Sequence, residues 1–216
     1  MHTHKRRELE KERRRQDIIR IAGEMFFSLG YDRVTMDNVA ASSELSTGTL
    51  YLYFRNKDAL FCAVVLEGVS ALNEMFHSVL GDKGTGAEKM RALGDAYLEF
   101  YHRYPGQFRA FVEMQSRPYP ADEEMEKISA IVQENIHQIM CRCLSEGIAD
   151  GSLRRNIDPL QTALFLILSM QSAICLTPAQ QAAFERARVP HDEFIRNSLD
   201  LLARSIESGQ SGNAEV

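Results

Sequence analysis

Residues Thr35 to Lys57 read TMDNVAASSELSTGTLYLYFRNK. Thr35 and Ser46 are good helix N-caps, because their hydroxyls accept hydrogen bonds from the free backbone N–H groups at a helix start. The segment therefore predicts a short helix from Met36 to Ser42, a three-residue turn, and a second short helix from Thr47 to about Tyr53. Two short helices on either side of such a turn are typical of a helix-turn-helix.

The second short helix has a small, polar outer side. Leu45 and Leu50 are expected to pack inward against Phe26, which lies in the preceding helical stretch. Hydroxyls, a bare glycine backbone and one tyrosine suit close approach to phosphates and base edges. The residues left on this outer side are Ser46, Thr47, Gly48, Thr49 and Tyr51.

The charge of the chain is divided unevenly, although its net charge is −5. Residues 1–57 hold 11 Lys or Arg against 8 Asp or Glu, a net of +3, and residues 58–216 hold 14 against 22, a net of −8. The most basic stretch lies between Lys5 and Arg15. A basic head on an acidic body indicates a local nucleic-acid surface, although interleaved glutamates make a solvated helix start the alternative for the basic stretch.

The rest of the chain has helical periodicity and no clear strand pattern. Apolar residues make up 44% of the sequence, which is enough for a packed core. Capping boxes are predicted at Thr85–Glu88 and Thr177–Gln180. Besides the two short helices, the expected helices cover about 8–29, 57 into the seventies, 86–103, 107–115, 122–149, 159–176, 178–188 and 190–207, and the tail after Gly209 is expected to be disordered.

The stretch from Ile21 to about Val65 resembles the DNA-binding domain of TetR-family transcriptional regulators. The resemblance rests on A-x-x-x-F at Ala22–Phe26, L-G-Y at Leu29–Tyr31, T-M-D-x-V-A at Thr35–Ala40, S-T-G-T-L-Y-x-Y-F at Ser46–Phe54 and N-K-D-A-L-F at Asn56–Phe61. It implies an all-α fold, with a three-helix helix-turn-helix head on a larger helical body that binds an effector and dimerises. We place the N-terminal arm and DNA-binding domain at residues 1–55, the effector-binding and dimerisation domain at 56–208, and the disordered tail at 209–216.

The resemblance also implies a function and a set of contacts. It implies a regulator, by family tendency a repressor, that leaves a palindromic operator when a small-molecule effector binds. Thr47 stands where relatives often have a basic residue, so part of the affinity is expected from the basic arm and Lys57. Packing alone is the alternative for Tyr51 and Tyr53. The family's DNA contacts fall on Thr35, Ser46, Thr47, Gly48, Thr49, Tyr51, Tyr53 and Lys57.

The predicted helix from Pro159 is apolar on nearly every side, so it needs cover on two faces. A homodimer through this helix and the last one supplies that cover; complete burial within one subunit is the alternative. The expected interface residues are Leu164, Phe165, Leu168, Phe194, Ile195, Leu199 and Leu202.

Polar or aromatic side chains on apolar faces are the candidates for effector contacts. Each of them could instead be a core or half-exposed helix residue; Gln171 could also pair across the dimer interface. The mixture favours an apolar or aromatic effector. The candidates are Tyr97, Tyr101, Phe108, Phe111, Glu113, Met114, Arg117, His137, Phe165, Met170 and Gln171.

Other classes of protein find little support in the sequence. Neither a membrane span nor a signal peptide is predicted, which favours the cytoplasm. Cys62, Cys141, Cys143 and Cys175 lie in apolar contexts and are interpreted as small hydrophobic residues. No catalytic residue, cofactor or metal site is expected. Two alternatives remain. One is an enzyme built on a helical bundle, and the other is a protein-interaction module that has the helix-turn-helix fold but does not bind DNA.

Overall fold

The computed structural model describes residues 2–81, 84–116, 119 and 123–208. These ranges are helices and their connections, with one isolated β-bridge between Leu153 and Glu207. The all-α prediction is therefore confirmed. By packing, the chain forms two compact units: Met1–Glu74 with Leu98–Val132, and Met75–Tyr97 with Gln133–Val216. The first unit extends beyond the 1–55 head expected from the sequence, because much of the helix Lys57–Leu80 and the helix Pro105–Gln115 belong to it. The predicted tail at 209–216 lies outside the described residues.

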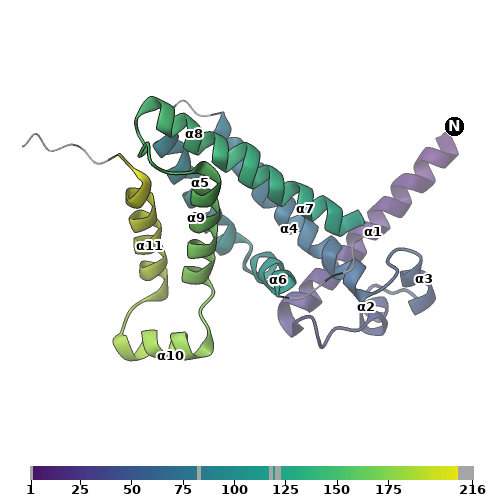
Figure 1. Ribbon diagram of the computed structural model, residues 1–216. Helices are drawn as coiled ribbons and strands as arrows, with labels where there is room; N and C mark the ends of the chain where they lie inside the picture. Colours follow the sequence, from purple (N-terminus) through teal and green to yellow (C-terminus); the bar gives the residue numbers. More distant parts are fainter. Residues whose placement is uncertain (1, 82–83, 117–118, 120–122, 209–216) are drawn as a thin grey trace, which may run out of the picture. The chain divides into compact units, whose positions relative to one another are not determined.

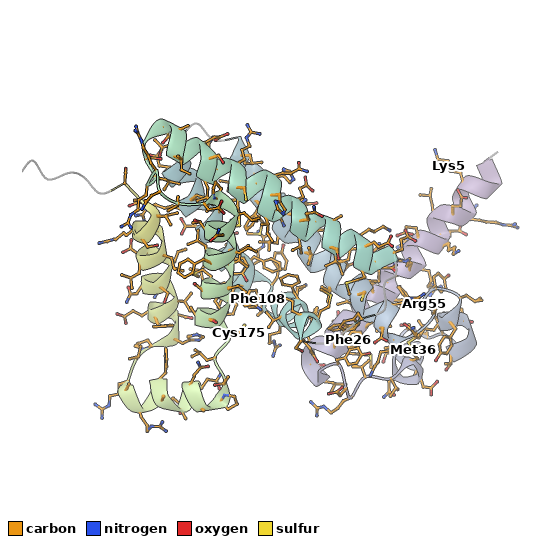
Figure 2. All side chains as sticks on the ribbon, in the orientation of Figure 1. Lys5, Phe26, Met36, Arg55, Phe108 and Cys175 are labelled. Carbon is orange, nitrogen blue, oxygen red and sulfur yellow. The ribbon has the colours of Figure 1, made fainter. Side chains whose placement is uncertain are left out.

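The first unit holds the helix-turn-helix. It contains α1 (His2–Leu29), α2 (Met36–Ser42), α3 (Thr47–Tyr51) and α6 (Pro105–Gln115), with parts of α4 (Lys57–Leu80), α5 (Gly86–Arg103) and α7 (Glu123–Glu134) (Figure 1). Phe26 and Phe61 meet edge to face at 5.0 Å in its core. Phe26 and Met36 lie inside this unit, whereas Lys5 lies on the projecting part of α1 (Figure 2).

The predicted caps of the first unit are confirmed. Thr35 accepts a hydrogen bond from the N–H of Asn38, and Ser46 accepts one from the N–H of Thr49. Asn56 likewise accepts from the N–H of Ala59 at the start of the helix that begins at Lys57. The start of the first helix was predicted wrongly: α1 begins at His2, not near Glu8. No glycine or proline stands in the added turns, and pairs such as Arg6–Glu10, at 2.9 Å, support the helix.

The second unit is a helical bundle. It contains η1 (Asn135–Met140), α8 (Cys141–Asp150), α9 (Pro159–Ile174), α10 (Pro178–Ala187) and α11 (His191–Ile206), with the end of α4 and the start of α5. Both predicted capping boxes form, at Thr85 and at Thr177. The predicted continuous α-helix over 122–149 is interrupted by the π-helical segment η1, a kind of irregularity that is frequent near functional sites.

Helix α4 is the one helix of the described ranges that is long and apolar enough to cross a membrane by composition. Its most apolar window is 61% buried within the protein. Such burial is typical of a core helix, which passes the same test of length and composition.

Candidate DNA-binding surface and interior pocket

The turn between α2 and α3 is held by local hydrogen bonds. The N–H of Leu45 donates to the carbonyl of Ala40 at 2.9 Å, and Glu44 adopts a left-handed conformation with φ of 55°. Leu50 is fully buried, so α3 is fixed to the core by its inner side. The opposite side of α3 therefore faces solvent in one orientation.

The predicted DNA contacts lie together on α2, α3 and the start of α4. Thr35, Ser46, Gly48 and Tyr51 are exposed, and the remaining four are half-buried. The Thr47 hydroxyl donates to the Asp37 carboxylate at 2.7 Å, which ties the start of α3 to α2. The Thr47 hydroxyl is thus already oriented in the absence of DNA. Helix α3 itself contains no lysine or arginine.

Lys57 has a structural role that the sequence did not reveal. Its ammonium group donates to the carbonyls of Tyr31 and Val34, both at 3.0 Å, and lies 4.1 Å from the centre of the Tyr31 ring. An ammonium group has three donors, so one remains for a phosphate. Lys57 thus holds the connection between α1 and α2 through two backbone carbonyls.

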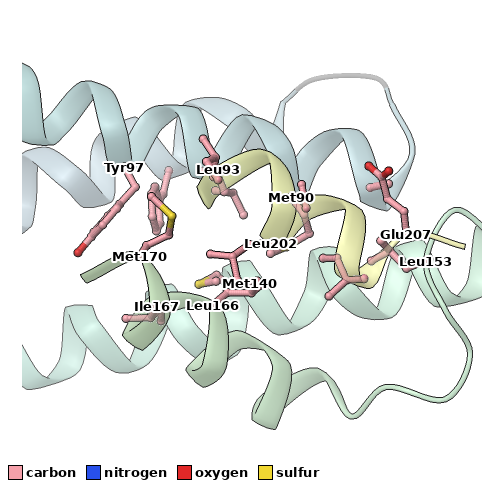
Figure 3. A pocket seen from close by; sticks show the side chains of 16 residues that line it. Met90, Leu93, Tyr97, Met140, Leu153, Leu166, Ile167, Met170, Leu202 and Glu207 are labelled. Carbon is pink, nitrogen blue, oxygen red and sulfur yellow. The ribbon is translucent and has the colours of Figure 1, made fainter. Parts of the chain in front are cut away.

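The second unit contains an apolar pocket of about 70 Å³. It is lined mainly by leucine, methionine and isoleucine side chains from α5, α9 and α11 (Figure 3). Tyr97 lies at one end and Glu207 at the other. Burial raises the pKa of Tyr97 far above its ordinary range, so its hydroxyl stays protonated. At the Glu207 end, the guanidinium of Arg91 donates to the Glu207 carboxylate at 2.6 Å.

The predicted effector residues are divided between the two units. Tyr97 and Met170 line the pocket, and Gln171 is half-buried on the same helix as Met170. Phe111 and Met114 belong to the core of the first unit, where Tyr101 and Phe108 meet edge to face at 5.3 Å. His137 and Phe165 are exposed. Glu113 borders a separate hollow beside the end of α1, and Arg117 lies outside the described residues.

Comparison with known proteins agrees with this geometry. Residues 18–64 match the family described as bacterial regulatory proteins, tetR family. Residues 18–64 are thus a TetR-family DNA-binding domain, and the chain as a whole is similar to TetR-family transcriptional regulators. It is 26% identical over 194 residues to the transcriptional repressor DhaR of Mycobacterium sp. (strain GP1), covering 90% of this chain and 94% of DhaR.

Two solved structures of regulators share the fold. FadR of Bacillus subtilis, in complex with stearoyl-CoA, has a TM-score of 0.67 at 19% identity, covering 87% of this chain and 97% of FadR. The ketosteroid regulator KstR2 of Mycobacterium tuberculosis has a TM-score of 0.64 at 15% identity, covering 90% of this chain and 95% of KstR2.

The two helices predicted to form the dimer interface, α9 and α11, pack against each other in the second unit. Leu164, Phe165 and Leu168 on α9 are exposed, and Phe194 on α11 is half-buried beside a surface groove. Ile195 is fully buried within the subunit. Leu199 and Leu202 are half-buried and line the pocket. The exposed apolar face therefore lies mainly on α9.

Leu52, which is less polar than the corresponding residue of some relatives, is 77% exposed at the end of α3 beside the expected DNA contacts. Two other features of the regulator were not singled out from the sequence. Leu201 is 68% exposed on α11 and extends the apolar face of α9. The aliphatic pocket lining was also missed, because a leucine facing a cavity has the same helical spacing as one facing the core.

Proposed function

We propose that this regulator is a repressor that binds a pseudo-palindromic operator as a homodimer and is released by a small apolar effector. The observation that carries the proposal is α3: its inner side is locked by the fully buried Leu50, and its outer side presents hydroxyls and Tyr51 to solvent. Repressor rather than activator is favoured by the likeness to DhaR. Such a protein acts in the cytoplasm.

The DNA contacts are proposed on residues 1–55 together with Lys57. Short hydroxyls at Ser46 and Thr49 bring the backbone of α3 close to the DNA. Tyr51 reaches furthest from the helix, and the exposed Leu52 is placed for apolar contact with a thymine methyl group. Because α3 has no cation, phosphate binding falls to side chains outside it.

Dimerisation is proposed through the exposed apolar face on α9 and α11. Leu168 and Leu201 are each more than 60% exposed, and Phe165 is 54% exposed. Exposed apolar side chains that cluster on one surface mark an interface between proteins. A second copy of the chain fits this face, because a two-fold dimer brings the same apolar patch of both subunits together and reads a two-fold site.

The effector is proposed to bind in the pocket of the second unit, which belongs to the 56–208 effector-binding domain. A cavity of ~150 Å³ binds benzene, so the pocket of about 70 Å³ must widen to hold an effector of that size or larger. Widening requires α5, α9 and α11 to shift. The effector therefore binds the widened state better, which is the condition for shifting the protein away from its DNA-binding state.

The chemistry of the effector follows from the lining. Tyr97 and Glu207 are the residues with polar side chains in a wall that is otherwise apolar, made of aliphatic and methionine side chains with Phe76 and Gly94. An apolar chain or ring system with one polar end fits such a pocket. Stearoyl-CoA, bound by FadR, and steroids, implied by the name of KstR2, are two ligands of this type among relatives.

Release of DNA by apolar compounds tests the proposal. A fluorescent duplex selected by the protein from a random pool is titrated with stearoyl-CoA, with free stearic acid and with a steroid. We expect at least one to release the DNA, and expect Ile167→Asn, which places an amide on the pocket wall, to weaken the response. Val189→Asn is the control, since Val189 is 41% exposed and does not line the pocket.

The two alternatives predict other results. A helical-bundle enzyme would turn over a bound compound, whereas we expect the compound to be recovered unchanged. Within the described ranges, no group of three His, Cys, Asp or Glu side chains is placed to hold a metal ion. An interaction module without DNA binding would select no duplex from the pool, and that result would overturn the proposed function.

A further inference from the structure

The N-terminal half of α1 extends beyond the core of the first unit as an exposed helix. Figure 1 shows this arm, drawn in purple, projecting past α2 and α3. Residues 5–14 are exposed along its whole length. No apolar face is buried there, so packing does not explain the extra turns of helix.

The charges of the arm are not evenly spread around the helix. Residues 5–15 hold seven Lys or Arg and three Glu, a net of +4. At 3.6 residues per turn, the spacing of four and three residues places Arg7, Lys11 and Arg14 in one row. We call these three side chains the basic row. Glu10 lies beside it, three residues after Arg7 and four before Arg14, and its carboxylate pairs with Arg6 outside the row.

One other basic side chain of the arm is paired within it: Arg6 donates to Glu10 at 2.9 Å. The Glu12 carboxylate accepts a hydrogen bond from the uncharged side chain of Gln16 at 2.9 Å. Arg15 is turned back into the first unit, where it pairs with Glu124 at 2.6 Å and lies 5.0 Å from the Phe54 ring centre. In the described part of the chain, no carboxylate pairs with the basic row.

We infer that the basic row is a second DNA-binding element, which lies along the phosphates of the duplex flanking each half-site. The inference rests on the proposed function. The row covers about 10 Å from Arg7 to Arg14 at 1.5 Å per residue, which is long enough to meet several phosphates of one strand. The Arg15–Glu124 pair fixes the base of the arm, so the row has a set direction from the head.

A pair of matched triple variants tests the inference. Arg7→Gln with Lys11→Gln and Arg14→Gln removes the basic row; Lys5→Gln with Arg6→Gln and Arg13→Gln removes the same charge from the other side of the arm. The probe is a duplex selected by the wild-type protein, with about 10 base pairs of flank outside each half-site. Binding is measured over a range of salt concentrations, and circular dichroism checks that both arms stay helical.

Each phosphate neutralised by the protein contributes about −0.9 to the slope of log affinity against log salt. We expect loss of the basic row to make this slope shallower by about 2 to 3 for each arm that contacts the duplex. The control triple variant should change the slope by less than about 1. On a duplex trimmed to the half-sites, the two triples should become equal. Equal slopes on the long duplex, or a difference that persists on the trimmed one, would overturn the inference. Wild-type protein that binds no duplex would overturn the proposed function itself.

Discussion

Tyr51 is the largest side chain that α3 presents to solvent, with 49% of its surface exposed. We expect Tyr51→Ala to lose operator affinity by roughly 10- to 100-fold, equivalent to about 1–3 kcal/mol for a specific base contact. The melting temperature should stay unchanged, because Tyr51 packs little against the core. Tyr53→Ala is the contrast, since Tyr53 packs on the core and its loss should lower stability. Normal operator binding by Tyr51→Ala would show that Tyr51 makes no contact.

Glu67, in the middle of α4, gives a prediction for stability against pH. Partial desolvation raises the pKa of this carboxyl above its ordinary value, and nearby Arg15 opposes the rise. The side chain remains solvent-exposed, so the expected effect on stability is small. A raised pKa means that the folded protein favours the protonated form, so stability falls as pH rises from the unfolded-state pKa through the folded one. We therefore expect Glu67→Gln to unfold at higher urea than wild type at neutral pH, with the gain shrinking as the pH falls through that window. Lower stability of the variant at neutral pH would contradict this.

Gly86 and Gly147 allow two helices of the second unit, α5 and α8, to touch through their backbones. A Cβ at Gly86 would lie 2.1 Å from the backbone nitrogen of Gly147, and backbone atoms cannot turn aside as a side chain can. We expect Gly86→Ala to lower the free energy of unfolding by about 1–3 kcal/mol or more. Urea titration measures it, with Gly81→Ala as control, because the nearest atom there is 3.8 Å away. Equal urea midpoints for Gly86→Ala and Gly81→Ala would show that the two backbones do not make this close contact.

Elements fixed by local chemistry were predictable from the sequence, and elements fixed by packing were not. The caps at Thr35, Ser46 and Thr177 depend on residues three positions apart, so the pattern alone locates them. The π segment η1 depends on how one helix fits its neighbours, which no local pattern encodes. The same limit holds for the candidate site: the surface of α3 follows from its spacing, whereas the bonds of Lys57 to two distant carbonyls require the fold.

The assembly of the whole molecule depends on the apolar face of α9 and α11. We expect Phe165→Asp or Leu168→Asp to yield monomers in sedimentation or light scattering, because a charge in an apolar interface loses its hydration without a partner. Leu9→Asp is the matched control: Leu9 is 64% exposed, but it lies on the α1 arm. Dimers of both α9 variants would place the interface elsewhere.

The central claim is that two heads of one dimer read a two-fold site through α3. The most direct test is a footprint of the protein on its selected duplex, with and without Tyr51→Ala, over a range of salt. We expect two protected half-sites related by a two-fold axis, with centres about one helical turn or a multiple of it apart. We also expect protection to be lost as the salt concentration rises and when Tyr51 is replaced by alanine. A single asymmetric footprint, or protection that neither salt nor Tyr51→Ala changes, would contradict this claim.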